Sequence, residues 1–136
     1  MTTQDAGNEL ADILRSAIVE LVRREGPDLS SRQLGVILTC YLEPEAQTVR
    51  GLAAQLEVSK PAITRALDRL ADFDLVRRKI DPLDRRSVLI QRTPKGTIYM
   101  RDLRTIMRKA AAEPPATGMA PKGSPPKTGR GARAKT

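Results

Sequence analysis

The stretch from residue 48 to residue 91 constrains the fold of this chain more than any other part of its sequence. A short helix fits residues 48–56, because Thr48 can serve as its N-cap. A second helix fits residues 59–71, with Ser59 as its N-cap and a proline in its first turn. Two short amphipathic helices joined by so brief a turn predict a helix-turn-helix.

Two strands joined by a turn rich in Asp and Arg are expected next. Residues 75–80 form the first predicted strand, residues 81–86 the turn, and residues 87–91 the returning strand. Val88 and Ile90 occupy alternate positions, as in a hairpin with one buried face.

A helix over residues 9–24 is expected before this segment, with one wide apolar stripe. The stripe consists of Leu10, Ile13, Leu14, Ala17, Ile18, Leu21 and Val22. It is broader than a small domain needs, so two interpretations stay open: it caps the core, or it also pairs with a second subunit.

Two more helices complete the predicted domain. One begins at Ser30, where Gln33 completes a capping box, and ends before Pro44. The other begins at Thr93, its N-cap, and continues to residue 112. Their predicted buried stripes are Leu34, Ile37, Leu38, Tyr41 and Leu42 in the first, and Ile98, Tyr99, Leu103, Ile106, Met107 and Ala110 in the second.

One domain over residues 9–113 is therefore expected, between a flexible N-terminus of residues 1–8 and a tail of residues 114–136. The tail is rich in Pro, Ala, Lys and Arg, and we expect it to be disordered. It holds five basic residues and no acidic ones, out of a formal net charge of +8. Subtracting these five charges leaves +3 for residues 1–113.

Composition limits the function classes that remain. The positive charge favours a polyanionic partner. With no His and one Cys, the chain lacks the usual general base, the commonest metal ligand and any disulfide framework. We therefore expect no enzyme, no catalytic residue, no metal site and no cofactor, with Cys40 as a packing residue. No apolar run approaches a membrane span and no signal-peptide pattern is present, so we expect a cytoplasmic, nucleoid-associated protein.

The outward face of the second helix, 59–71, is the first candidate site. The major groove of duplex DNA admits such a helix, and its N-terminal residues reach the base edges. The candidates are Ser59, Lys60, Pro61, Ala62, Thr64, Arg65 and Arg69, with Pro61 and Ala62 as small apolar contacts. A solvated helix face is the alternative interpretation.

The predicted hairpin is the second candidate site. An exposed Arg at a hairpin tip can enter a minor groove, and a neighbouring carboxylate can hold that Arg extended. The candidates are Arg77, Arg78 and Lys79 for phosphates, and Asp84, Arg85 and Arg86 near the turn. An ordinary polar turn is the alternative interpretation.

These motifs, in this order and spacing, resemble the multiple-antibiotic-resistance regulator (MarR) family of winged helix-turn-helix repressors. The resemblance rests on LSSRQLGVILTCYL, LAAQLEVSKPAITRALDRL, LVRRKIDPLDRRSVLI and RTPKG. It implies a mainly α fold of five helices with a small β-hairpin, the wing. It implies that the helix beginning at Ser59 reads the major groove, and that Asp84 supports Arg86 in the minor groove.

Members of this family are typically dimers joined through their N- and C-terminal helices. The resemblance therefore implies a homodimer on double-stranded DNA, joined through helices 9–24 and 94–112. Three features depart from the family pattern. Asp74 stands where the family usually has Gly, and Asp tolerates the left-handed backbone conformation needed there. A single helix follows the wing, so the C-terminal dimerisation region is shortened. With so few aromatics, a crevice for a small-molecule effector is hard to assemble, so an effector is possible but unsupported.

We therefore expect a sequence-specific bacterial transcription regulator, and specifically a repressor. Two rivals remain. One is an architectural nucleoid protein that coats DNA through its wing and basic tail with little sequence preference. The other is a winged-helix module that has turned to contacts with proteins, against which the basic residues on both helix and wing argue.

Overall fold

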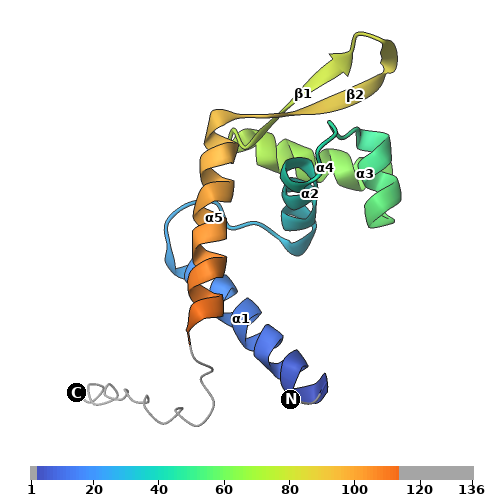
Figure 1. Ribbon diagram of the computed structural model, residues 1–136. Coiled ribbons are helices and arrows are strands. Elements are labelled where there is room, and N and C mark those ends of the chain that lie inside the picture. Colours follow the sequence, from blue (N-terminus) through green and yellow to red (C-terminus); the bar gives the residue numbers. More distant parts are fainter. Residues whose placement is uncertain (1–2, 114–136) are drawn as a thin grey trace, which may run out of the picture.

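The computed structural model describes residues 3–113, which form five helices and one two-stranded antiparallel hairpin (Figure 1). The predicted fold, mainly α with a small winged hairpin, is confirmed. The elements in chain order are α1 (Thr3–Arg23), α2 (Ser31–Leu42), α3 (Val49–Leu56), α4 (Lys60–Asp72), β1 (Val76–Asp81), β2 (Asp84–Arg92) and α5 (Pro94–Ala112). The predicted disordered tail, 114–136, lies outside the described residues.

The helix starts follow the predicted caps. The Ser30 hydroxyl accepts a hydrogen bond from the Gln33 amide at 3.2 Å, and the Gln33 side chain accepts one from the Ser30 amide at 2.9 Å. Thr48, Ser59 and Thr93 each accept a backbone hydrogen bond three residues further on, so each satisfies an amide that its helix leaves unpaired.

The first helix requires a correction. It begins at Thr3 and not at Glu9, so residues 3–8, predicted to be a flexible N-terminus, are helical. Asp5 lies in the first turn, where a negative charge interacts favourably with the positive end of the helix dipole. Only Ala17 of α1 is buried.

The core lies between α2, α3, α4, the base of the hairpin and the first half of α5. Ile37 of α2, Leu52 of α3 and Leu67 of α4 are fully buried, as predicted. The fully buried side chains also include Val36, Ile63, Leu70, Leu75, Val76, Met100 and Thr93.

Two predicted stripes are displaced. In α2, Val36 and Cys40 are buried while Leu42, at the end of the helix, is exposed. In α5, Met100 is buried and Ile98 is half exposed. The reason is that α2 contacts both α4 and β2, and α5 contacts both α1 and α2, so each helix buries more than one face. A single stripe at helical spacing describes a helix that packs on one side only.

A buried hydrogen-bond network joins α2, the turn after α4 and the start of α5. The Tyr41 hydroxyl donates to the Leu75 carbonyl at 2.6 Å and accepts from the Thr93 amide at 3.0 Å. The Thr93 hydroxyl donates to the Asp74 carbonyl at 2.7 Å and accepts from the Gly96 amide at 2.8 Å. Asp74 has a φ of 59°, the left-handed conformation that was predicted for it. The network holds the base of the hairpin against α5.

Helix α1 packs along the second half of α5, away from the hairpin (Figure 1). The Arg24 guanidinium pairs with the Asp102 carboxylate at 3.2 Å where the two elements meet. Among the described residues, no helix is both long enough and apolar enough to cross a membrane.

Candidate nucleic-acid interface

The exposed face of α4 carries most of the residues predicted to read the major groove. Its first turn begins at the N-cap Ser59, whose hydroxyl accepts a hydrogen bond from the Ala62 amide at 3.2 Å. The exposed candidates are Ser59, Lys60, Pro61, Thr64, Arg65 and Arg69. Ala62 is a correction, because it is only 6 % exposed and packs on the core side of the helix. The small apolar surface of this face therefore comes from Pro61 alone.

Arg69 lies at the other end of α4. Its guanidinium stacks over the Phe73 ring at 4.8 Å from the ring centre. A guanidinium that stacks on a ring uses its flat face, so its N–H groups, which point outward in its own plane, stay free to donate hydrogen bonds. The contact therefore orients Arg69 near the α4–β1 turn, away from Ser59 and Lys60.

The hairpin turn is shorter than predicted. Residues 81–86 were expected to form the turn, but only Pro82 and Leu83 separate the strands, and Asp84–Arg86 belong to β2. The Asp81 carboxylate accepts a hydrogen bond from the Leu83 amide at 2.9 Å, which closes the turn locally. Asp84 therefore pairs with Asp81, and Arg86 belongs to β2 at a place where the strand register shifts, between the pairs Asp81–Asp84 and Ile80–Val88.

Asp84 is held by three short-range contacts. One carboxylate oxygen accepts from the Arg86 amide at 3.1 Å and lies 3.5 Å from the Arg86 Nε, and the other accepts from the Ser87 hydroxyl at 3.3 Å. These contacts, the Arg86 amide first, lower the pKa of Asp84 below its ordinary value. The Arg86 side chain remains 87 % exposed. The carboxylate thus touches the guanidinium at one nitrogen and leaves its other donors available.

The three consecutive basic residues of β1 do not share one face. Successive side chains of a strand point to opposite sides, so Arg77 and Lys79 lie on one face and Arg78 on the other. Arg78 is opposite the buried Ile90 in the strand pairing, and its guanidinium contacts the Asp68 carboxylate of α4 at 2.7 Å. Arg77 lies 3.6 Å from Asp74, and both of these side chains are exposed.

Arg50 is a candidate that the sequence interpretation missed. It is exposed in the first turn of α3, and its charge contributes to the lowered pKa of Asp84, so it lies near the hairpin. The segment before α3 pairs with the free edge of β2: the Ile90 amide donates to the Gln47 carbonyl at 2.9 Å, and Thr48 forms a bridge with Leu89. The sequence feature that could have identified Arg50 is its position, a basic residue two positions after the helix cap Thr48.

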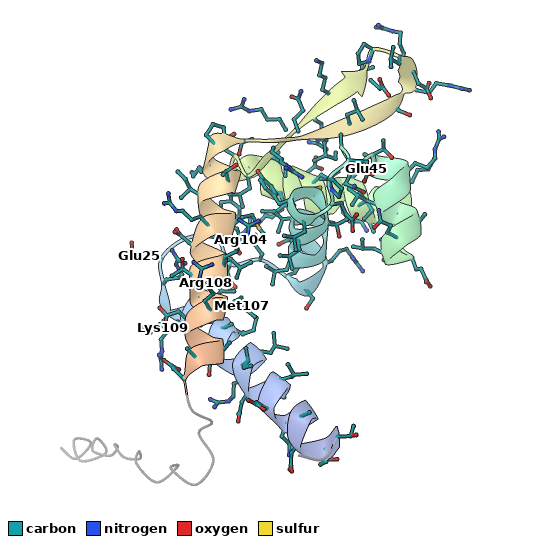
Figure 2. All side chains as sticks on the ribbon, viewed as in Figure 1. Glu25, Glu45, Arg104, Met107, Arg108 and Lys109 are labelled. Carbon is teal, nitrogen blue, oxygen red and sulfur yellow. The ribbon has the colours of Figure 1, made fainter. Side chains whose placement is uncertain are left out.

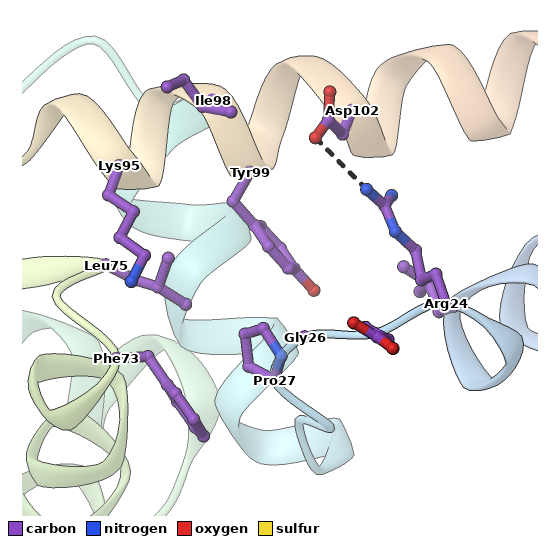
Figure 3. A pocket seen from close by; sticks show the side chains of 11 residues that line it. Arg24, Gly26, Pro27, Phe73, Leu75, Lys95, Ile98, Tyr99 and Asp102 are labelled. Atoms are coloured by element: carbon purple, nitrogen blue, oxygen red, sulfur yellow. Dashed lines mark hydrogen bonds and ion pairs between the residues drawn. The ribbon is translucent and has the colours of Figure 1, made fainter.

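A cavity of about 180 Å³ lies between the end of α1, the α4–β1 turn and the start of α5 (Figure 3). Phe73 and Tyr99 line it, with Arg24 and Lys95 at its polar side. Burial raises the pKa of the Tyr99 hydroxyl above its ordinary value. Two of the three aromatic side chains of the chain therefore meet here. The cavity is smaller than the roughly 300 Å³ at which ligand pockets typically begin.

Cys40 is buried, and burial raises the pKa of its thiol to about 12. Because the thiolate is the nucleophile and the metal ligand, a thiol with so high a pKa is inert near neutral pH. Within residues 3–113, no group of three or more His, Cys, Asp or Glu side chains is placed to hold a metal ion.

Comparison with known proteins gives one family and several solved structures. The family model described as MarR family matches residues 29–88. The chain is similar to the transcriptional regulator BldR from Sulfolobus solfataricus, with 31% identity over 80% of this chain and 81% of that chain and a TM-score of 0.55. It is also similar to the structure of MarR, with 28% identity over 74% of each chain and a TM-score of 0.58. The transcriptional regulator Tm0710 from Thermotoga maritima shares the fold, with 23% identity over 79% of this chain and 75% of that chain and a TM-score of 0.63. A search of curated proteins gave no match.

Proposed function

The chain belongs to the MarR family of transcriptional regulators, and on that premise we propose that it binds specific sites in double-stranded DNA and represses transcription. In this proposal α4 reads the major groove through Lys60, Thr64 and Arg65. Arg86 enters the adjacent minor groove, and the phosphate contacts come from Arg77, Lys79 and Arg85. The protein acts as a binding protein of the cytoplasm and nucleoid and not as an enzyme.

One observation carries the proposal. The exposed basic residues of α4 and the Asp84–Arg86 pair of the hairpin stand on two elements that are joined directly by the 2.7 Å contact between Asp68 and Arg78. A helix and an arginine-bearing hairpin held side by side suit adjacent grooves of one duplex. Arg50 extends the same basic surface toward α3.

The test is selection of bound fragments from random duplex DNA with the full-length chain. We expect recovery of one sequence with two related half-sites, and retention of that sequence in the presence of excess unrelated duplex. An architectural protein would lose the labelled site to unrelated duplex at equal concentration. Recovery of no preferred sequence would contradict the proposal and favour that alternative.

Replacing Arg86 with Ala should weaken binding to the selected site by about 1–3 kcal/mol, or roughly 5- to 150-fold, without changing the fold. The side chain is almost fully exposed, so its loss removes a contact and little packing. Equilibrium binding, followed by fluorescence anisotropy, measures the change. Arg32→Ala, which removes an exposed Arg from the first turn of α2, is the matched control and should bind normally. Normal binding by Arg86→Ala would remove the hairpin from the mechanism.

We further propose that the protein is a homodimer joined through α1 and α5. Four large apolar side chains of α1 are exposed, and they follow one another at every fourth residue: Leu10, Leu14, Ile18 and Val22. Ile98 and Met107 of α5 are exposed as well, and Figure 2 shows Met107 on the part of α5 far from the hairpin. Side chains four apart share one side of a helix, so α1 presents an apolar stripe that the rest of residues 3–113 leaves exposed. A second copy of the chain would cover it.

The architectural alternative draws its support from the tail, whose five basic residues lie outside the described residues. Deleting residues 114–136 should weaken binding to all duplexes alike, because release of counterions from the phosphates is independent of sequence. The magnitude of the slope of log K against log salt should decrease by up to about 4.5, or roughly 0.9 for each of the five cations. A titration over salt concentration, repeated with the selected site and an unrelated duplex, measures both effects. A change in sequence preference on deletion would mean that the tail reads bases.

A further inference from the structure

The pairing of the hairpin separates Arg78 from its basic neighbours. In β1, Val76, Arg78 and Ile80 share one face, and their partners across the hairpin are Arg92, Ile90 and Val88. Val76 and Ile90 are buried, so this face is the one turned toward the body of the protein. Arg78 therefore points inward from the strand, whereas Arg77 and Lys79 point outward.

The inward direction brings Arg78 to α4. Its guanidinium lies 2.7 Å from a carboxylate oxygen of Asp68, a short distance for a charge-assisted hydrogen bond. Asp68 is an acidic residue on the exposed side of the recognition helix, between Arg65 and Arg69. A carboxylate at that place would repel DNA phosphates unless a cation neutralised it, and Arg78 supplies that cation.

The pair is also placed where the hairpin leaves the body of the protein. On the other edge, β2 is attached through Ile90 and Leu89 to the segment before α3. Two residues beyond Arg78, Ile80 is exposed, and Leu83 at the turn is almost fully exposed. Within residues 3–113, the ion pair of Arg78 with Asp68 is thus the ion pair to α4 that lies nearest the hairpin turn along β1.

We propose that Asp68 and Arg78 are positioning residues that set the distance between the recognition helix and the wing. This proposal rests on the proposed function, because the two elements are taken to contact adjacent grooves. It also replaces the prediction that Arg78 binds a phosphate. Both side chains are partly exposed, and ion pairs of that kind contribute little to folding stability, so the pair acts on recognition more than on the fold.

The test is a double-mutant cycle with Asp68→Ala, Arg78→Ala and the double variant, measured on the selected site and on unrelated duplex. Each single variant should bind the selected site about tenfold more weakly, and the double variant no more weakly than either single variant. The affinity for unrelated duplex should stay within about twofold of the wild-type value. The slope of log K against log salt should stay within about half a unit of the wild-type slope. Asp68→Asn, which keeps the size of the side chain, should repeat the Asp68→Ala result.

A phosphate-binding Arg78 gives the opposite pattern. Arg78→Ala would then weaken binding to both duplexes and lower the salt slope by about one, while Asp68→Ala would strengthen binding, and these results would overturn the proposal. The matched control is Asp72→Ala, which removes an exposed acid from the end of α4; an equal loss there would also overturn it. If the wild type itself prefers no sequence, the proposed function fails and this proposal fails with it. If the wild type is selective and the cycle is additive, only this proposal fails.

Discussion

Replacing Leu14 and Ile18 together with Glu should convert the protein to monomers and weaken its binding to a site with two half-sites by 100-fold or more. When two reading units are linked, the second binds at a high effective concentration, and separating them loses a factor of about 10²–10⁴. Both residues belong to the exposed stripe of α1, so carboxylates there do not disturb the core of one chain. In a dimer that covers the stripe, however, the two carboxylates would be buried in the interface and would destabilise it.

Light scattering after gel filtration measures the mass, and binding to one and two half-sites measures the affinity. Affinity for a single half-site should be unchanged, which separates loss of dimerisation from unfolding. Leu42→Glu is the matched control, because Leu42 is 59 % exposed on α2 and Leu14 is 58 % exposed on α1. A Leu14/Ile18 double variant that remains a dimer would show that the stripe is not the interface.

The substitution Gly96→Ala should destabilise the protein by about 2–5 kcal/mol, since overpacking of a core and loss of buried hydrogen bonds act together. A methyl group at Gly96 would collide with the Tyr41 hydroxyl and with the Leu75 carbonyl. The carbonyl is backbone and cannot rotate away. Relief therefore requires Tyr41 to leave the network, which strands the buried Leu75 carbonyl and Thr93 amide.

Chemical denaturation followed by circular dichroism measures this effect. The control is Gly7→Ala, the same substitution in α1, where the new methyl group has no atom within 4 Å beyond its chain neighbours and the helix's own backbone. Ala is a better helix former than Gly by up to about 1 kcal/mol, so Gly7→Ala should be neutral or stabilising. Equal stability of Gly96→Ala and the wild type would mean that Tyr41 and Leu75 do not pack as described.

The helix boundaries of the central segment were predictable because they depend on local chemistry. A capping hydroxyl such as Ser30 or Ser59 bonds to an amide three residues away, so the sequence alone contains both partners. The left-handed turn at Asp74 was expected from the family resemblance, because Asp stands where the family usually has Gly and tolerates that conformation. The start of α1 was not predictable in this way. Residues 3–8 are polar and carry no apolar periodicity, so their sequence does not show that they extend the helix beginning at residue 9.

Most candidate residues on α4 and the hairpin are exposed, as predicted, but their geometry was predicted less well. Ala62 was assigned to the groove-reading face because it is small and near the helix start, but the direction of its side chain depends on how α4 packs. Arg78 was grouped with Arg77 and Lys79, although alternation along a strand places it with Val76. Its pairing with Asp68 required knowing that β1 lies against α4, which only the tertiary structure provides.

The continuity of β2 and α5 has a mechanical consequence. Only Thr93 separates the end of the hairpin from the first residue of α5, and its hydroxyl makes two hydrogen bonds in the network around Tyr41. Helix α5 has 19 residues and is therefore about 28 Å long. Over that length, a tilt of the whole helix by about 10° corresponds to a displacement of roughly 5 Å at its far end. If two copies meet along α1, as we propose, a change in that contact would reach the hairpin through α5, because the tightly packed junction at Gly96 has no room even for a methyl group.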